Sequence, residues 1–502
     1  MAISIVAQFW ESWHFLIDAG SAVSPVRVSL RTMKLAATVC LSLALLLITG
    51  CVHFRPQPLE PDKSAAEFES RSLTNADLRA FLQKNLHKEL PTWPMVSWDF
   101  ETLTLVALYY HPSLEVARAD WRVLTAAEGT AAERPNPTVA PSGTYEPAEG
   151  AFSPWIPSII FDLPIETAGK RQRRIEQAAH QSESARLNIA TAAWQVRNRL
   201  RTSLLEFSAA QQRLALLERV VQLRQELFKR LESQYQAGAI SAFDLNIVRL
   251  ALMRAQSDLA DLRRMLAEAR PNLADSLGLP DAALEGMEFR YDFKELAAAE
   301  ALTSRKARET ALLSRTDIRG ALADYAASQS ALQLEIAKQY PDIHLSPAYM
   351  WNAGSTGEHD WQIGGAIELP VLNRHRGPIA EAAARRNASA ARFVALQAKV
   401  VGEIDAAIAN LRAAGTNVAS LEALAAAQAK QQQQMEAQFQ VGAVDRLEVL
   451  TAQVELNAAE VARFEAQVKF QESFGNLENA VQRPFELPQA IYQSSQNNAR
   501  RN

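Results

Sequence analysis

The chain has few of the residues that build metal centres or disulfide frameworks. Among its 502 residues only Cys40 and Cys51 are cysteines, and the eight histidines show no His-x-x-Glu-His spacing. A Cys-x-x-Cys pair and the Gly-Lys-Ser or Gly-Lys-Thr of a phosphate-binding loop are also absent. The sequence therefore predicts no metal site, no cofactor and no nucleotide-driven chemistry, and nothing in it points to an enzyme.

An excess of charge of one sign is also missing. Fifty-two Lys and Arg residues stand against 56 Asp and Glu residues, so the formal net charge of −4 does not indicate a nucleic-acid partner. Hydrophobic residues make up 48% of the chain. Many of them are Ala and Leu, mixed with Gln, Glu and Arg, which is typical of long helices.

Proline and glycine are scarce over two long stretches. Between Glu166 and Tyr235 there is no proline, and Gly169 is the only glycine. About 70 helical residues would extend roughly 105 Å, and residues 378–440 predict a second helix of similar length. Such lengths predict coiled-coil packing. The 4-3-4-3 spacing of a heptad seam is present in Val248, Leu252, Ala255, Leu259 and Leu262.

The N-terminus carries an export signal. Met33 and Lys34 precede an apolar run at 35–48 that is shorter than the ~20 residues of a spanning helix. Residues 1–50 are interpreted as an over-called start and a signal peptide, with the true start at Met33. Ile-Thr-Gly-Cys at 48–51 resembles a lipobox, in which Cys51 becomes the lipidated first residue of the mature chain. The alternative is an ordinary signal peptide with an accidental cysteine.

The rest of the chain is a duplication. Gln-Tyr-Gln-Ala-Gly-Ala-Ile at 234–240 returns as Gln-Phe-Gln-Val-Gly-Ala-Val at 438–444, an offset of 204 residues, whereas solenoid units recur every 20–50 residues. Each half is expected to contain a helix, a hairpin, a long helix, a tight turn and a helix. The predicted organisation is an extended, lipidated segment at 51–99, the first repeat at 100–280, a linker at 281–302, the second repeat at 303–483 and a disordered tail at 484–502.

Alternating residues predict one β-hairpin in each repeat, at 138–163 and 342–370. Apolar side chains occupy every second position, and the strands have about the 9–11 residues that cross a membrane when tilted. Four strands cannot close a barrel, so the chain must oligomerise, and three copies would supply twelve strands. Ordinary soluble hairpins are the alternative. The expected outward set is Ile343, Leu345, Ile363 and Ile367, and the expected inward set is Asp342, His344, Gln362 and Glu368.

Four prolines bracket the hairpins, at Pro135, Pro164, Pro341 and Pro370. Proline lacks the N–H that a sheet ladder or a helix interior needs, so it belongs where a helix gives way to a strand. These prolines are interpreted as swivels between the helical and strand sections.

The repeated glycine motif predicts tight reversals at 236–243 and 440–447. Gly238 and Gly442 would supply the positive φ that other residues resist. Ser241 and Asp445 could cap the outgoing helices. Asp244 and Glu448, each six residues after its glycine, would favour the positive end of a helix dipole.

Taken together, the duplicated halves, the lipobox, the proline-bounded hairpins and the paired glycine turns resemble the TolC family of outer membrane efflux proteins. The resemblance runs from about residue 100 to 483, and Leu-Pro-Ile-Glu at 163–166 with Leu-Pro-Val-Leu at 369–372 is similar to the heavy-metal efflux branch. The implied fold is mainly α with a small transmembrane β part. A long coiled-coil helical barrel would continue into a β-barrel, and both would be completed by trimerisation.

The resemblance also implies a function. The homotrimer would be a lipid-anchored exit duct in the outer membrane of a Gram-negative bacterium, extending into the periplasm. It would conduct substrates passively from a periplasmic adaptor protein and an inner-membrane pump, of the RND type. The family's adaptor-docking tips would fall on Tyr235, Gly238, Ile240, Ser241, Phe439, Gly442, Val444 and Asp445.

The same family places tip acids at the closing pore, which makes Asp244 and Glu448 gate candidates as well as capping residues. One family feature is missing. The arginine expected two residues after the second glycine is Val444 here, and Arg446 is the nearest replacement. Two other functions remain as alternatives: a duct for type I protein secretion, which has the same architecture, and a coiled-coil scaffold lipoprotein without a pore.

The lipobox interpretation makes the first testable prediction. Cys51→Ala should abolish incorporation of labelled fatty acid, because the acylated thiol is lost, while part of the transport activity should survive through the membrane strands. Labelling of the variant at the level of the parent protein would contradict the lipobox.

Overall fold

The computed structural model describes residues 53–147, 154–293, 304–352 and 358–484. The chain divides into two units, Met1–Ala65 and Ala66–Asn502. Cys51, the signal segment and the tail after residue 484 lie outside the described residues. Within the described part of the first unit, residues 53–60 have no regular secondary structure. Helix α3 (Pro61–Glu69) begins directly after them.

The expectation that residues 51–99 are extended is wrong for two stretches. Both α3 and α4 (Ala76–Leu86) are helices, and β1 (Ser97–Trp98) pairs in parallel with β4 (Glu288–Phe289). Pro61 is the first residue of α3, where proline costs no hydrogen bond, and Asn75 caps α4 by accepting from the Asp77 amide at 2.7 Å. Of the prolines in this segment, Pro61 therefore marks a helix start rather than an extended chain.

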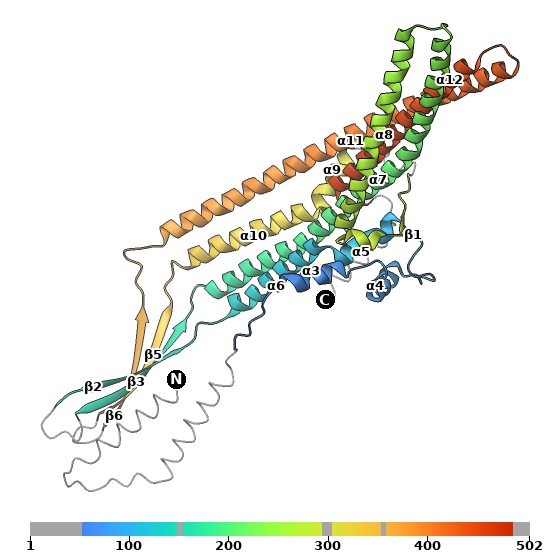
Figure 1. The fold of residues 1–502 in the computed structure, drawn as a ribbon. Helices are drawn as coiled ribbons and strands as arrows, with labels where there is room; N and C mark the ends of the chain where they lie inside the picture. The colour runs from blue at the N-terminus through green and yellow to red at the C-terminus, as the bar shows by residue number, and fades with distance from the viewer. Residues whose placement is uncertain (1–52, 148–153, 294–303, 353–357, 485–502) are drawn as a thin grey trace. The chain divides into compact units, whose positions relative to one another are not determined.

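The two repeats have the same order of elements (Figure 1). The first contains α5 (Phe100–Tyr110), α6 (Pro112–Ala132), β2 (Thr138–Tyr145), β3 (Trp155–Ile165), α7 (Lys170–Gln236) and α8 (Ala242–Leu277). A 3-10 turn, η1 (Asp281–Leu284), and β4 follow. The second contains α9 (Ser304–Ser314), α10 (Thr316–Ala337), β5 (Ile343–Asn352), β6 (Glu358–Ile367), α11 (Arg376–Gln440) and α12 (Arg446–Val481). The prediction of a mainly helical protein with a small β part is confirmed.

The strands of the sheet and the helices joined to them follow the same spatial order. The sheet order is β2-β3-β5-β6, with every neighbouring pair antiparallel. Among the helices α6 packs on α7, α7 on α10, and α10 on α11 (Figure 1). Each helix therefore continues the strand to which it is joined, and the elements at the two edges, β2 with α6 and β6 with α11, come from different repeats.

Two coiled coils extend from this layer, α7 with α8 and α11 with α12, and α12 also packs on α7. Leu252, Ala255, Leu259 and Leu262 of the predicted seam are buried. The densest burial lies at the far end of each coil from its turn, where Leu200 and Leu204 of α7 and Leu273 and Leu277 of α8 are fully inaccessible. Burying a leucine stabilises by about 1.5–3 kcal/mol, so these ends anchor the coils and the turns do not.

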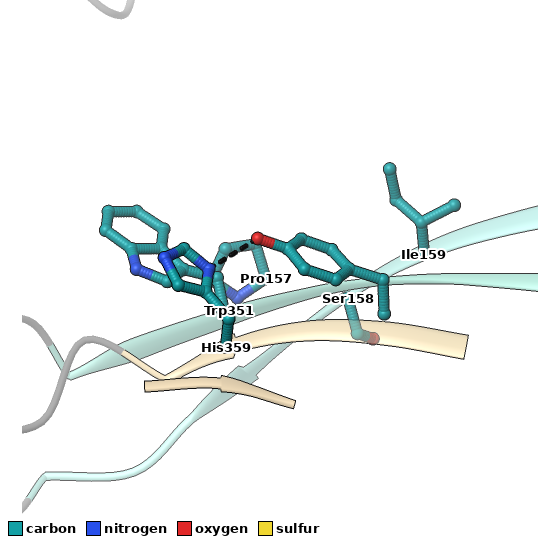
Figure 2. Close-up of a pocket in the computed structure, with 6 residues that line it drawn as sticks. Pro157, Ser158, Ile159, Trp351 and His359 are labelled. Atoms are coloured by element: carbon teal, nitrogen blue, oxygen red, sulfur yellow. Dashed lines mark hydrogen bonds between the residues drawn. The ribbon is translucent and has the colours of Figure 1, made fainter. Parts of the chain in front are cut away.

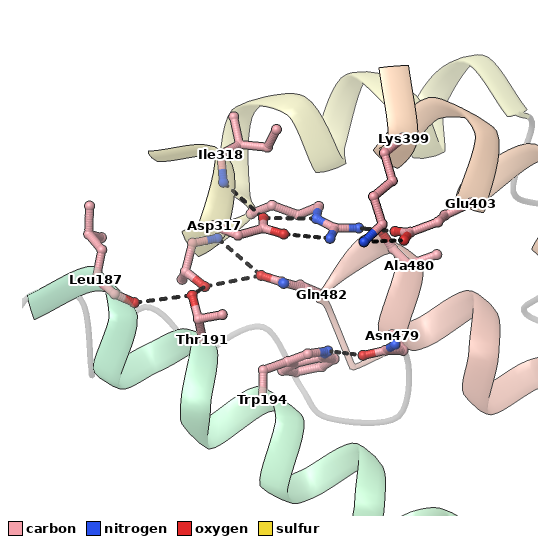
Figure 3. Close-up of polar contacts among 12 residues, drawn as sticks. Leu187, Thr191, Trp194, Asp317, Ile318, Lys399, Glu403, Asn479, Ala480 and Gln482 are labelled. Atoms are coloured by element: carbon pink, nitrogen blue, oxygen red, sulfur yellow. Dashed lines mark hydrogen bonds and ion pairs between the residues drawn. The ribbon is translucent and has the colours of Figure 1, made fainter. Parts of the chain in front are cut away.

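The last turns of α8 and α12 end in the same backbone conformation but are held by different contacts. Gly278 and Gln482, 204 residues apart, both end their helices in the left-handed conformation. A Cβ on Gly278 would lie 2.8 Å from Cα of His111, so the backbones approach too closely for any side chain. In the second repeat Oε1 of Gln482 accepts from both the amide and the hydroxyl of Thr316, at 3.1 Å each (Figure 3).

A buried ion cluster links α7 to the end of α12. Glu478, 1% exposed, lies 2.6 Å from Arg201 and 3.0 Å from Arg197. The ring of Phe100 lies 4.7 Å from the guanidinium of Arg201, a favourable cation–π distance. At the two residues after Glu478, Arg315 at the start of α10 donates to the Ala480 carbonyl at 2.6 Å, and Trp194 donates to Asn479 at 3.0 Å (Figure 3).

This cluster should dominate the stability of the junction. Glu478→Gln removes the charge between the buried guanidinium of Arg201 and the partly buried one of Arg197 and should cost about 3–5 kcal/mol. The matched control is Asp405→Asn in the half-exposed Arg308–Asp405 pair, which should cost less than about 1 kcal/mol. Thermal unfolding midpoints of the detergent-solubilised variants measure the difference. Equal midpoints would contradict the assignment.

Candidate functional site

The turn between α7 and α8 is a glycine-ended helix stop. Gly238 has φ of +74°, the Gly238 amide donates to the Tyr235 carbonyl at 2.9 Å, and the Ala239 amide donates to the Gln234 carbonyl at 2.8 Å. The second of these bonds closes the wide ring typical of a left-handed helix end. Tyr235 is exposed and Ile240 is half-buried. The turn therefore presents its own backbone and two aromatic side chains, Tyr235 and Phe243, to the surroundings.

The turn between α11 and α12 repeats this geometry. Gly442 has φ of +73°, its amide donates to the Phe439 carbonyl at 3.0 Å, and the Ala443 amide donates to the Gln438 carbonyl at 2.9 Å. Phe439 and Val444 are half-buried here. The docking residues predicted from the sequence thus lie at two equivalent helix reversals, one in each repeat.

The two tip acids cap helices. Ser241 Oγ accepts from the Asp244 amide at 3.2 Å, and the Asp244 carboxylate accepts in return from the Ser241 amide at 3.4 Å. Asp445 accepts from the Glu448 amide at 3.0 Å, and Glu448 accepts in return from the Asp445 amide at 3.1 Å. Both are reciprocal capping boxes. Each acid therefore has a structural role, and a role in the gate stays a prediction.

Arg446 connects the two tips. It follows Asp445 at the start of α12 and lies 4.0 Å from Glu226 of α7 and 4.0 Å from Glu436 of α11. Its guanidinium is 5.8 Å from the centre of the Phe439 ring. Sequence reasoning named Arg446 but not its carboxylate partners, because they lie ten or more residues away in the chain.

The sheet has one apolar and one polar face. Residues paired across antiparallel strands share a face, and the pairing joins Leu163 with Leu345, and Ile343 with both Ile165 and Ile367. Most apolar residues of this face are exposed, including Trp361 at 79% and Ile363 at 84%. The same strand pairing places His359 on the apolar face, opposite Trp351. The sequence had not assigned His359 to either face.

The polar face carries a small hydrogen-bonded cluster. Asp162 of β3 accepts from His344 Nδ1 at 3.0 Å and from the Ser346 hydroxyl at 3.2 Å. The hydroxyls of Ser142 and Ser158 lie 2.7 Å apart on the same face. His344 and Gln362 occupy this face, as the alternation predicts. Asp342 and Glu368 lie just outside β5 and β6.

Aromatic residues close both hairpins at their loop ends. Tyr145 and Trp155 lie 5.1 Å apart between ring centres, and Tyr349 and Trp361 lie 5.0 Å apart. A pocket of about 200 Å³ beside them is lined by Pro157, Ser158, Ile159, Tyr349, Trp351 and His359 (Figure 2). The Tyr349 hydroxyl and His359 Nδ1 are 2.6 Å apart. The lining holds no carboxylate that could orient His359, so it lacks the third group of a catalytic triad.

The predicted swivel prolines occupy three different kinds of position. Pro135 and Pro341 lie in the short links that lead into β2 and β5, and Pro370 follows the end of β6. Pro164 differs from the expectation because it lies inside β3, opposite His344, one residue before the strand ends. The missing amide of a proline is tolerated near a strand end, which is why the strand runs through it.

Charged contacts join strand and helix at these links. Lys170, at the start of α7, lies 2.8 Å from Asp342, and the Thr167 amide donates to the same carboxylate at 2.9 Å. Burial acts against ionisation of Asp342, but these two donors outweigh it and hold the carboxyl pKa below its usual value. In the second repeat His375 contacts Glu335 at 2.6 Å.

The described residues contain no group of three or more His, Cys, Asp or Glu side chains that could hold a metal ion. Within the same part of the chain, no helix combines the length and apolar character that a membrane span requires.

Comparison with known sequences identifies the family to which this architecture corresponds. The profile of the family described as outer membrane efflux protein matches residues 106–279 and 307–481, one segment in each repeat. The cobalt-zinc-cadmium resistance protein CzcC of Cupriavidus metallidurans is 24% identical over 217 residues, which cover 43% of this chain and 50% of that protein. The chain spans about half the length of the curated relatives it matches.

Solved structures share the fold. The outer-membrane channel OprN has a TM-score of 0.63 at 19% identity, with 86% of this chain and 98% of that chain covered. The outer membrane protein VceC of Vibrio cholerae has a TM-score of 0.61 at 19% identity, with 77% and 97% covered.

The glycine turns make a local prediction. Gly238→Ala places a side chain at positive φ and should lower the local opening free energy of the tip by about 1 kcal/mol. Gly402→Ala in the interior of α11, where a Cβ meets nothing within 4 Å, should instead stabilise its helix by roughly 0.5–1 kcal/mol. Amide hydrogen exchange around each position measures both changes. The same sign at both sites would contradict the turn geometry.

Proposed function

The chain belongs to the outer membrane efflux protein family, and on this basis we propose that three copies form the exit duct of an efflux system. The strands would form a closed pore in the outer membrane, and the helices would continue it into the periplasm. Lipid attached to Cys51 would add a second anchor. The duct would perform no chemistry, so the energy for transport would come from its partners.

The observation that carries this proposal is the pair of open edges. All residues of β2 are exposed, and those of β6 from residue 359 on are exposed too, so both edge strands offer unpaired backbone groups. Within a membrane each unpaired group costs several kcal/mol, so the edges need partners. One edge comes from each repeat, which means that β6 of one copy can join β2 of the next.

The internal repeat indicates how these edges meet. Leu163 and Leu369 are 206 residues apart, as are Pro135 and Pro341, so β6 corresponds to β3 and β2 to β5. The observed β3–β5 pairing, for example Ile160 with Ala348, then maps onto Ala366 of one copy with Ser142 of the next. The exposed segment after β6, including Leu369 at 71% and Val371 at 72%, would be covered by the same contact.

The tips are the proposed contact with a periplasmic adaptor protein. Tyr235, Phe439 and the two glycine turns lie at the ends of the coiled coils, farthest along each coil from the buried clusters that anchor it. In a trimer Asp244 and Glu448 would each occur three times around one axis, which supports their proposed role as gate residues. Arg446 lies between Glu226 and Glu436. We propose that it makes the charge contact that the family assigns to an arginine at position 444, which is Val444 in this chain.

The proposed source of substrate is an inner-membrane pump of the RND type. The name of CzcC and the sequences at 163–166 and 369–372 favour heavy-metal cations as cargo. A duct for type I protein secretion is the second candidate, favoured by the same fold. Measuring transport in cells that carry an RND pump and in cells that carry a type I secretion pump separates the two candidates.

Disulfide trapping tests the closed ring. Ser142→Cys combined with Ala366→Cys should give covalent dimers and trimers on oxidation, because paired strand residues lie ~4.5–5.5 Å apart, within disulfide range. The matched control Ser142→Cys with Gly364→Cys moves one partner by two residues and should cross-link far less. Cross-links only in the control would revise the register. Their absence in both variants, together with the absence of conductance in planar bilayers, would favour a scaffold without a pore.

A further inference from the structure

The link between β6 and α11, residues 368–375, exposes an apolar side chain almost completely. Leu372 is 99% exposed, and no large hydrophobic side chain in the described part of the chain is more exposed. The link begins directly after Ile367, the last residue of β6. Leu369 and Val371 extend that strand toward the next copy of the chain in the proposed ring, whereas Leu372 lies beyond the strand pairing.

The link has defined contacts with the neighbouring helix. The His375 amide donates to Asn373 Oδ1 at 2.9 Å, and His375 Nε2 lies 2.6 Å from Glu335 of α10. The other carboxylate oxygen of Glu335 accepts from Lys338 at 2.7 Å. These contacts hold Leu372 in its exposed position, so its exposure is a property of the fold.

Two positive charges lie beside this leucine. Arg374 and Arg376 are exposed, and neither side chain makes a hydrogen bond or ion pair with any residue that the structure describes. Glu335, the acid of α10 that contacts the link, is already bound to His375 and Lys338. The link therefore presents two uncompensated cations next to an exposed apolar side chain.

The first repeat shows how the corresponding link is covered. The residues that precede α7 and α11 share a left-handed conformation and are 206 positions apart, which aligns the two links. Leu372 then corresponds to Glu166, which pairs with Arg174 of its own repeat. The counterpart of Arg174 is Ala380, whose methyl group cannot reach back as the arginine does. The second repeat therefore leaves Leu372 uncovered.

The same comparison leaves Arg376 without a partner. It corresponds to Lys170, which lies 2.8 Å from Asp342 of the other repeat. The counterpart of Asp342 is Asn136, which belongs to the next copy in the proposed ring and carries no charge. Closing the ring therefore does not neutralise Arg376.

We propose that this link binds an anionic glycerophospholipid in the membrane leaflet on the side of the helices. Leu372 enters the acyl-chain region, and Arg374 and Arg376 bind the lipid phosphate. The inference rests on the proposed duct, because there the strands cross the membrane and the link lies at its surface. Cations beside an apolar side chain favour an anionic membrane surface, and the guanidinium group donates paired N–H bonds to phosphate.

Native mass spectrometry of the detergent-solubilised trimer, titrated with dioleoyl phosphatidylglycerol, tests the charged contact. Arg374→Gln combined with Arg376→Gln should weaken binding about five- to thirtyfold in roughly 0.1 M ammonium acetate, as expected for two basic residues at an anionic surface. The matched control, Arg385→Gln with Arg386→Gln, removes the same charge about 14 Å along α11, beyond the ~10 Å screening length, and should bind as the parent does. Equal weakening in both variants, or none in the first, would overturn the inference.

A photoreactive diazirine amino acid in place of Leu372 tests the apolar contact in phosphatidylglycerol nanodiscs. Its cross-links should be to phospholipid, identified by mass. A cross-link to a second copy of the chain instead would overturn the inference and leave the duct standing, because protein would then cover the link. Failure of the parent protein to conduct in planar bilayers would overturn the duct itself. If the arginine variant does not assemble, the cross-link at position 372 still decides the matter.

Discussion

The alignment of the two repeats depends on the carboxylate of Glu478 between two arginines of α7. Arg197 and Arg201 come from the first repeat and Glu478 from the second, so the cluster joins the two repeats where α7 packs on the end of α12. Taking these charges out of water costs free energy. The aromatic ring of Phe100 and the surrounding leucines exclude water that would compete for the ion pairs. The tips and the sheet lie at the two ends of elements that pass through this point.

Much of the fold could be predicted because its signals are local. Residues 234–244 and 438–448 specify their turns through one glycine and one capping box each, and the alternation around Leu345 and Ile363 specifies two sheet faces. The two incorrect predictions both concern proline, because proline occurs in different backbone structures at different positions. Pro61 begins a helix and Pro164 lies within a strand, and only the neighbouring backbone decides between these outcomes.

The contacts that hold the site could not be read from the sequence. Glu478 and Arg201 are 277 residues apart, and neither residue has a neighbour in the chain that marks it as buried. The same applies to Lys170 with Asp342 and to Asp162 with His344, whose pairing depends on the register between strands of different repeats. A single sequence contains the periodicity of each strand but not the offset between two strands.

The ends of α8 and α12 have a consequence for how the protein can change over evolutionary time. At Gly278 the Cα of His111 lies 2.8 Å from where a side chain would begin, whereas Gln482 holds the equivalent helix end through its side-chain oxygen on Thr316. The two halves have thus reached different solutions to one packing problem. The two helix ends are therefore no longer interchangeable: Gln482→Gly would lose the contact with Thr316, and Gly278→Gln would have no room beside the backbone of His111.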